Sequence, residues 1–149
     1  MSDEQATMLI VAARDAARNA HAPYSNFAVG AALLMTDGSI VTGTNFENAS
    51  YGLSLCAETV AVARANAEGK LREIVAVGIV GGMMTDGVAH GFDPIRPCGR
   101  CRQVLNEAAQ MGRRDLAVYC AGAQGDAVET HLLSELLPHA FGPGDLGIG

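Results

Sequence analysis

Two short stretches of the sequence carry residue types that can do chemistry together. They are Cys56-Ala57-Glu58 and Pro97-Cys98-Gly99-Arg100-Cys101. Three thiolates can hold a zinc ion and leave its fourth tetrahedral position open to water, as in a catalytic zinc site. Zinc makes that water acidic enough to supply hydroxide near neutral pH, and a nearby carboxylate can move the protons. These residues therefore predict a zinc site held by Cys56, Cys98 and Cys101, with Glu58 as its acid–base group.

The spacing of Cys98 and Cys101 fits two ligands in the first turn of a helix. There the helix dipole and free N–H groups favour thiolate over thiol. A Cys-x-x-Cys pair also fits a redox dithiol or half of a structural zinc site. A dithiol oxidoreductase leaves the Cys-Ala-Glu stretch unexplained, and a structural zinc module needs a fourth protein ligand. Cys120 is interpreted as a buried, inert thiol. The four histidines are not spaced as metal ligands and are left out of the site; they are His21, His90, His131 and His139.

The order of the two stretches matches the zinc deaminase signature, with Cys56 in the position of its histidine. Further segments resemble the small homotetrameric cytidine deaminases, in the same order, from about residue 20 to about residue 145. They are Pro23-Tyr24-Ser25-Asn26-Phe27-Ala28-Val29-Gly30, Asn45-Phe46-Glu47-Asn48-Ala49-Ser50-Tyr51-Gly52-Leu53, Pro97-Cys98-Gly99-Arg100-Cys101-Arg102-Gln103, Leu136-Leu137-Pro138 and Phe141-Gly142-Pro143.

This resemblance implies an activity and an assembly. The reaction would be zinc-dependent hydrolytic deamination of cytidine and 2'-deoxycytidine to uridine and 2'-deoxyuridine, with release of ammonia, in pyrimidine salvage. The cofactor would be one zinc per chain, and the assembly a homotetramer with shared active sites. Another cytosine-containing nucleoside is the alternative substrate. Within the deaminases, an enzyme that edits nucleic acid is the runner-up.

The resemblance also assigns substrate-binding residues. Asn45 and Glu47 match the pair that binds the ribose 3'-hydroxyl, for which an amide and a carboxylate supply a donor and acceptors. Phe27 matches the aromatic residue that packs on the nucleoside, and Ala57 would offer backbone groups to the base. Phe141 matches a C-terminal aromatic residue that closes over the base from a neighbouring subunit. Taken alone, Asn45 and Glu47 would be interpreted as loop caps.

One position departs from the family pattern. Many relatives carry arginine after the Cys-Ala-Glu glutamate, and this chain has Thr59. Three thiolates on zinc leave a net charge of −1, which opposes formation of hydroxide on the metal. Donors to the sulfurs would offset that charge. Arg100 and Arg102, beside two of the ligands, are the candidates for this role.

Length and charge narrow the class of protein. A chain of 149 residues suggests one domain, residues 1–149, with a sizeable core. A net charge of −6 and a pI near 5.0 argue against a nucleic-acid partner. The acidic start lacks the features of a signal peptide, and the apolar stretches are too short for a membrane span. We therefore expect a cytoplasmic enzyme with reduced cysteines, a small nucleoside substrate and no membrane partner.

Hydrophobic periodicity and turn residues predict alternating helices and strands. We expect helices over 5–19, 56–68, 98–111 and 131–137, with Ser54 capping the second and Gly112 ending the third. We expect strands over 27–35, 40–45, 74–80, 116–120 and 127–129, a glycine-rich loop over 81–96 and a loose tail over 142–149. This order predicts an α/β fold, a three-layer αβα sandwich around a mixed five-stranded sheet. The first two strands form a hairpin, and the resemblance implies that the last two are parallel.

Overall fold

The computed structural model describes residues 3–148. Met1, Ser2 and Gly149, which belong to the predicted domain, lie outside the described residues. The α-helices of this region are α1 (Asp3–Ala17), α2 (Ala57–Ala67), α3 (Gly99–Met111) and α4 (Leu133–Leu136). Its strands are β1 (Phe27–Met35), β2 (Ile40–Thr44), β3 (Ile74–Thr85), β4 (Val88–His90), β5 (Ala117–Gly122) and β6 (Val128–Leu132). Short 3-10 helices cover Tyr51–Leu53, Leu71–Glu73 and Pro143–Leu146.

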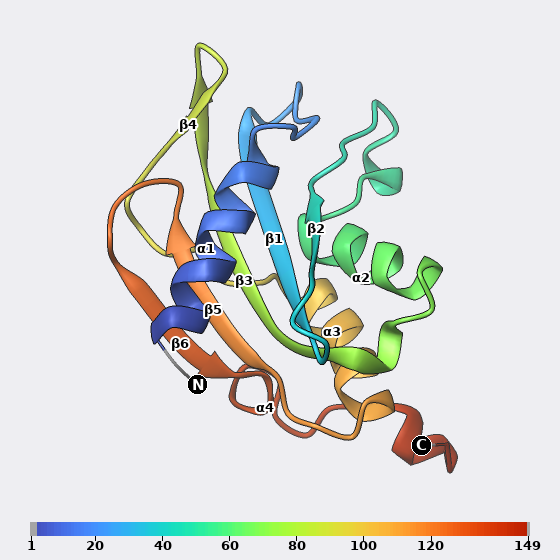
Figure 1. Cartoon of the computed structure of the whole chain (residues 1–149). Coiled ribbons are helices and arrows are strands. Elements are labelled where there is room, and N and C mark those ends of the chain that lie inside the picture. Colours follow the sequence, from blue (N-terminus) through green and yellow to red (C-terminus); the bar gives the residue numbers. More distant parts are fainter. Residues whose placement is uncertain (1–2, 149) are drawn as a thin grey trace.

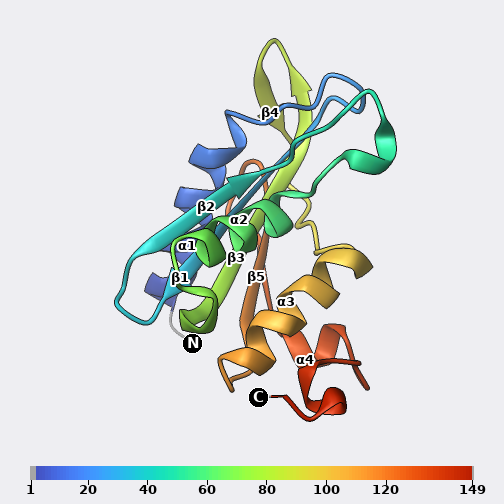
Figure 2. The same cartoon turned by 90° about the vertical axis from the view of Figure 1, so that its right-hand side faces the viewer.

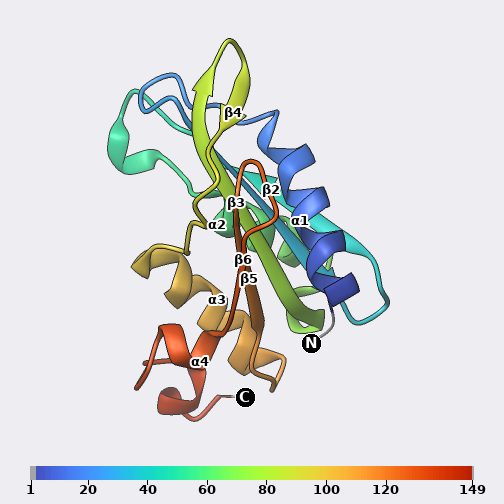
Figure 3. The same ribbon diagram turned by 90° about the vertical axis from the view of Figure 1, so that its left-hand side faces the viewer.

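The strands form one mixed sheet in the order β2-β1-β3-β5-β6, with β4 paired to β3. Strand β1 is antiparallel to both β2 and β3, and β3 is parallel to β5. Helix α1 covers one face of the sheet, and α2 and α3 cover the other (Figures 1 and 2). Figure 3 shows the same three layers from the side opposite to that of Figure 2, with α4 beside α3. The predicted fold class, a three-layer α/β sandwich around a mixed sheet, is confirmed.

Side chains of the central strands alternate between two cores, one on each face of the sheet. Leu33 and Ile79 are fully buried against α2 and α3, whereas Ala32 and Val80 are fully buried against α1. A central strand buried on both faces reads as a continuous apolar run, which is why 27–35 was recognisable. Each fully buried Leu, Ile or Val contributes about 1.5–3 kcal/mol. The two cores fix the sheet on which α2 and α3 are placed.

Strand β3 is longer than predicted. It continues through Gly81, Gly82, Met83 and Met84, and β4 returns beside it, where we expected a glycine-rich loop. A Cβ at Gly82 would lie 2.1 Å from the carbonyl oxygen of His90. The glycine is therefore needed for close approach of two strands, which is a recognised use of glycine inside a strand. The resulting hairpin projects beyond the rest of the sheet (Figure 1).

The predicted parallel pairing of the last two strands is wrong. Strands β5 and β6 are antiparallel, with Tyr119 opposite Thr130 and Cys120 opposite Glu129. The connection over 123–127 is too short for a parallel pair, which needs a crossover of about a dozen residues or more. The parallel neighbour of β5 is β3, and α3 lies in the crossover between them.

Local sequence explains where the site-bearing helices lie. Gly43 in β2 lets α2 approach closely, because a Cβ there would lie 2.5 Å from the Ala61 nitrogen. The N-cap of α2 is Cys56 and not Ser54 as predicted; the Ser54 hydroxyl instead accepts a hydrogen bond from the Asn48 N–H at 3.0 Å. Helix α3 ends at Met111 before Gly112, as predicted.

Smaller differences concern the two ends of the chain. Helix α1 starts and stops about two residues earlier than predicted, and His131 and Leu132 belong to β6 instead of the last helix. The tail is not loose throughout, since Pro143–Leu146 forms a 3-10 helix. No helix within residues 3–148 is long and apolar enough to cross a membrane.

Candidate active site

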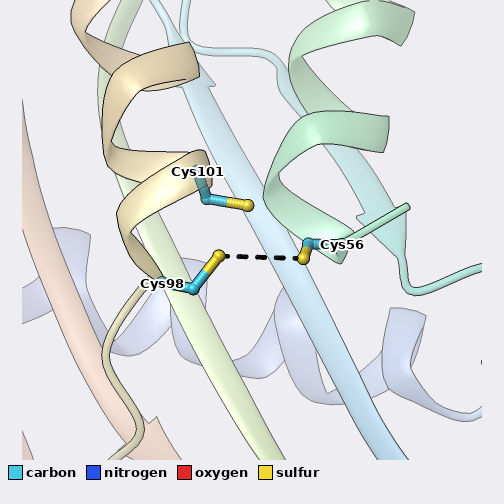
Figure 4. Close-up of side chains that lie close together, drawn as sticks. All are labelled: Cys56, Cys98 and Cys101. Atoms are coloured by element: carbon cyan, nitrogen blue, oxygen red, sulfur yellow. Dashed lines mark hydrogen bonds between the residues drawn. The ribbon is translucent and has the colours of Figure 1, made fainter. Parts of the chain in front are cut away.

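Helices α2 and α3 bring three cysteines together at their N-terminal ends. Cys56 is the N-cap of α2, Cys98 is the N-cap of α3, and Cys101 lies in the first turn of α3. The sulfurs of Cys56 and Cys98 are 3.9 Å apart, and all three sulfurs lie within 4.8 Å of one another. Figure 4 shows the three side chains converging from the two helices.

The cysteine cluster fits a zinc ion. Sulfurs bound tetrahedrally to zinc at ~2.3 Å would be about 3.8 Å apart, close to the Cys56–Cys98 separation of 3.9 Å. Among residues 3–148, the group of possible metal ligands at this point consists of the three cysteines alone. Three protein ligands are the number that a catalytic zinc site uses, whereas structural sites use four. The cluster therefore fits one zinc per chain with a position open for water.

The cysteines influence one another's protonation. The Cys101 thiol, hydrogen-bonded to Cys56, lowers the pKa of Cys56. That same interaction, together with burial, raises the pKa of Cys101 far above its ordinary value. Without a metal, the cluster therefore keeps a proton on its most buried sulfur. Zinc binding would release it, because the ligands of zinc are thiolates.

A cavity of about 420 Å³ opens above the cysteines. Its volume is within the range of pockets for small ligands. It is lined by Ser25, Phe27, Val29, Asn45, Glu47, Ser54, Leu55, Cys56, Ala57, Glu58, Ile95, Arg96 and Cys98. Two larger cavities lie away from the cysteines, one of about 590 Å³ between α1 and the β3–β4 hairpin and one of about 520 Å³ between α3 and α4, so we place the site at the cavity of about 420 Å³.

Glu58 lies in the first turn of α2 and lines this cavity. The residue is only 4% exposed, and burial raises the pKa of its carboxyl group. Its own backbone N–H and the Cys101 thiol oppose that shift. A carboxyl group with a raised pKa beside a metal site can both accept and donate a proton near neutral pH.

Asn45 has structural contacts that the sequence did not reveal. Its side-chain oxygen accepts a hydrogen bond from the Val29 N–H at 3.0 Å, and its side-chain nitrogen donates to the Phe27 carbonyl at 2.8 Å. The amide thus ties the end of β2 to the start of β1, where Phe27 enters the cavity wall. Asn45 lines the cavity as well, so it also lies where a substrate-binding residue is needed.

Glu47 lies at the rim of the cavity and is held in place by the loop before β1. Its carboxylate accepts hydrogen bonds from the Tyr24 N–H at 3.0 Å and the Ser25 N–H at 3.2 Å, and from the Ser25 hydroxyl. The Ser25 hydroxyl is the main reason why the pKa of Glu47 is lowered. The carboxylate therefore stays ionised, and able to accept hydrogen bonds, into the acidic range.

The other two predicted substrate-binding residues of this region, Phe27 and Ala57, also line the cavity. Phe141 does not. The residue is 61% exposed, and its carbonyl oxygen accepts hydrogen bonds from the side chains of Gln103 and Asn106 at 2.8 and 3.2 Å. Five predicted site residues therefore line the cavity at the cysteines, and Phe141 does not line it. The five are Phe27, Asn45, Glu47, Ala57 and Glu58.

Six lining residues were not among the predicted site residues: Ser25, Val29, Ser54, Leu55, Ile95 and Arg96. Ser25 lies in a segment that carried the family resemblance, and Arg96 directly precedes Pro97, so position in the motifs was the available signal. Arg96 contacts Glu129 of β6 at 2.7 Å. That contact crosses from the cavity wall to the edge of the sheet and could not be inferred from sequence spacing.

The two candidate charge-compensating arginines point elsewhere. Arg102 donates to the carbonyls of Pro97 and Leu136 at 2.7 and 2.8 Å, and Arg100 reaches the carbonyl of Ser54 at 3.5 Å. Both arginines thus brace backbone around the site. The hydroxyl of Thr59 lies 3.4 Å from the Cys101 sulfur.

Zinc-dependent deaminases are the class of enzyme that combines a three-cysteine site with a glutamate that is not a ligand. This chain belongs to the family described as the cytidine and deoxycytidylate deaminase zinc-binding region, whose model matches residues 2–115. The predicted family of zinc enzymes is therefore confirmed.

Individual relatives cover nearly the whole chain. It is 47% identical to a cytidine deaminase of Halalkalibacterium halodurans over 139 residues, which are 93% of this chain and 96% of that protein. It is 44% identical to a cytidine deaminase of Mycobacterium tuberculosis over 146 residues, 98% of this chain and 96% of that one. The crystal structure of a Burkholderia pseudomallei cytidine deaminase matches with a TM-score of 0.77 and 44% identity, over 95% of this chain and 100% of that one.

Proposed function

We propose that this chain hydrolyses cytidine and 2'-deoxycytidine to uridine and 2'-deoxyuridine, with release of ammonia, in pyrimidine salvage. The observation that carries the proposal is a cluster of three sulfurs, those of Cys56, Cys98 and Cys101, at a cavity that Glu58, Asn45 and Glu47 also line. Relatives named cytidine deaminase over nearly the full length support it. A redox dithiol is disfavoured, because Cys98 and Cys101 share their cluster with Cys56.

In this mechanism Cys56, Cys98 and Cys101 hold zinc, which when bound supplies a water acidic enough to act as a nucleophile near neutral pH. Glu58 accepts a proton from the attacking water and passes it to N3 of cytosine, while the water oxygen bonds to C4. Glu58 then carries the remaining hydroxyl proton to the exocyclic amino group. The C4–N bond breaks, ammonia leaves, and the keto group of uracil remains. General acid–base steps of this kind contribute roughly 10²–10⁴-fold.

The other cavity residues orient the nucleoside. In this proposal Phe27 supplies an apolar face for packing, and the backbone of Ala57, next to Cys56, holds the base. Glu47 is ionised and can accept a hydrogen bond from the ribose 3'-hydroxyl. The second N–H of the Asn45 amide can donate to the same hydroxyl, because its known contacts use one donor and one acceptor.

The proposal includes a homotetramer in which subunits share active sites. The resemblance to the homotetrameric cytidine deaminases is the basis for it, and two exposed aromatic residues are available for subunit contacts. Tyr51 is 74% exposed beside the cavity rim, and Phe141 is 61% exposed outside it. Phe141 would close over the base of a neighbouring subunit. We also infer a single domain and a cytoplasmic location, consistent with four free cysteines.

A spectrophotometric assay tests the activity. Purified protein should lower the ultraviolet absorbance of cytidine and of 2'-deoxycytidine at wavelengths where cytosine absorbs more strongly than uracil, with one ammonia released per uridine or deoxyuridine formed. A chelator should stop the reaction, and added zinc should restore it. A panel with other cytosine nucleosides and cytidine 5'-monophosphate tests the alternative substrates. Turnover of another substrate with no turnover of cytidine would refute the proposed substrate.

A further inference from the structure

The side chain of Thr59 connects α2 to a sulfur on α3. Its hydroxyl oxygen lies 3.4 Å from the sulfur of Cys101, within the distance expected for a hydrogen bond to sulfur. Cys101 is fully buried, so water does not solvate its sulfur. A buried thiolate without a hydrogen-bond donor is costly. The Thr59 hydroxyl is therefore placed at the one ligand that most needs a donor.

The three sulfurs differ in the side chains that surround them. Cys56 and Cys98 are the N-caps of α2 and α3, where the free N–H groups and positive dipole ends of the helices lie. Cys101 is the third residue of α3, still in its first turn, and is turned toward α2. A side chain of α2 can therefore reach its sulfur. Arg100 and Arg102 hydrogen-bond to backbone carbonyls instead.

We propose that Thr59 is a positioning residue of the metal site. Its hydroxyl donates a hydrogen bond to the Cys101 thiolate, fixes the rotamer of that ligand and withdraws electron density from the sulfur. Three thiolates on a divalent zinc leave a net charge of −1, so a single donor changes the electron density at the metal. The inference rests on the ligands named under the proposed function.

Hydrogen bonds from groups outside the ligand set orient and tune metal ligands, and their loss costs about 10–100-fold in metal affinity or activity. We expect that loss for Thr59→Val, which keeps the shape of the side chain and removes the donor. Thr59→Ser keeps the hydroxyl and should restore wild-type behaviour. Thr44→Val is the matched control, because the Thr44 hydroxyl also hydrogen-bonds in a half-buried place, to the Val29 carbonyl at 2.9 Å, away from the sulfurs.

Two measurements on the full-length proteins test the inference. The first is zinc affinity, by competition with a chromogenic chelator. The second is the thiolate-to-cobalt charge-transfer band of the Co²⁺-substituted proteins, which moves to lower energy when a thiolate becomes more electron-rich. Thr59→Val should bind zinc about 10–100-fold more weakly and show the shifted band. Thr59→Ser and Thr44→Val should match the wild type.

An unchanged cobalt band in Thr59→Val overturns the inference, whatever the zinc affinity, because a packing role would leave the sulfur unaltered. A shifted band in Thr59→Ser overturns it as well. These failures would leave a wild type that binds one zinc per chain and deaminates cytidine. A wild type without a thiolate-to-cobalt band would instead refute the ligand set, and with it the proposed function.

Discussion

The sulfur of Cys56 lies 3.9 Å from the sulfur of Cys98, although 42 positions separate the two residues in the chain. Each cysteine is the N-cap of its helix, so their separation is set by how α2 and α3 pack on the same face of the sheet. The metal site and the fold are therefore linked. Zinc binding should stabilise the packing of the two helices, since binding free energy adds to folding free energy.

The first prediction concerns the ligand set. Cys101→Ala should lose most of the bound zinc, measured as metal per chain, and should unfold at a lower temperature than the wild type. Cys120→Ala is the control, because Cys120 is equally buried but lies outside the cluster. It should keep its zinc and lose on the order of 1 kcal/mol of stability through the small cavity created. Full zinc occupancy in Cys101→Ala would remove that residue from the site.

The second prediction concerns Glu58. Glu58→Gln should keep zinc and fold and lose at least about 10²–10⁴-fold in kcat, because an amide cannot carry protons. It should also stabilise the metal-free protein at neutral pH. The folded-state pKa of Glu58 is raised, so the wild type loses stability as pH rises above the unfolded-state pKa of this carboxyl group. Denaturation of both metal-free proteins at acidic and neutral pH measures the difference. If Glu58→Gln increased the free energy of unfolding equally at both pH values, the raised pKa of Glu58 would be contradicted.

The third prediction is that Asn45 contributes to folding stability as well as to substrate binding. Asn45→Ala removes the hydrogen bonds to Val29 and Phe27 and should cost about 1–3 kcal/mol of folding stability, besides raising KM. Urea denaturation measures the loss of folding stability. Asn48→Ala is the control, because Asn48 makes a local, exposed hydrogen bond to the Ser50 N–H. Equal stability of Asn45→Ala and wild type would show that the two β1 contacts contribute nothing.

Much of the fold could be predicted from local sequence patterns. The 27–35 strand and its hairpin partner followed from a buried apolar run and an Asp-Gly turn, and the ends of α2 and α3 followed from their glycines. The extension of β3 was hidden because Gly81 and Gly82 resemble a loop in sequence, although Gly82 serves close strand approach. The antiparallel β5–β6 pair was within reach, since a five-residue connection excludes a parallel one.

The metal ligands could be predicted because three cysteines in two short motifs carry their own chemistry. Part of the cavity wall could not be predicted, because Ile95 and Arg96 enter it through the crossover between β3 and α3. The two contacts of Asn45 were equally hidden, since a side-chain amide can serve a backbone or a ligand with the same groups. The family resemblance identified the residue, and only packing shows what its amide touches.

The fourth prediction is a pH effect at Glu47. The Ser25 hydroxyl lowers the pKa of Glu47, so Ser25→Ala should raise it toward its ordinary value. As pH falls, the carboxylate should then be protonated at a higher pH in the variant, and KM for cytidine should begin to rise at a higher pH than in the wild type. Ser39→Ala is the control, because Ser39 makes the same kind of contact to Asp37 in the distant β1–β2 turn. Superimposable KM profiles of Ser25→Ala and wild type would exclude this role of Ser25.

The last prediction tests whether Phe141 acts across a subunit boundary. Phe141→Ala should raise KM with little effect on stability, because the side chain is 61% exposed in one chain. Its backbone contacts to Gln103 and Asn106 do not depend on the ring and should remain.

Mixed assemblies distinguish a contribution in trans from one in cis. Chains carrying Phe141→Ala and chains carrying Glu58→Gln can be co-expressed with different affinity tags, and assemblies containing both purified in tandem. If Phe141 closes a neighbour's site, a chain with intact Glu58 can receive Phe141 from a Glu58→Gln neighbour. Activity at low cytidine, per intact Glu58, should then exceed that of the Phe141→Ala protein alone. If Phe141 served its own chain, every chain with an intact Glu58 would lack it, and mixing would produce no gain.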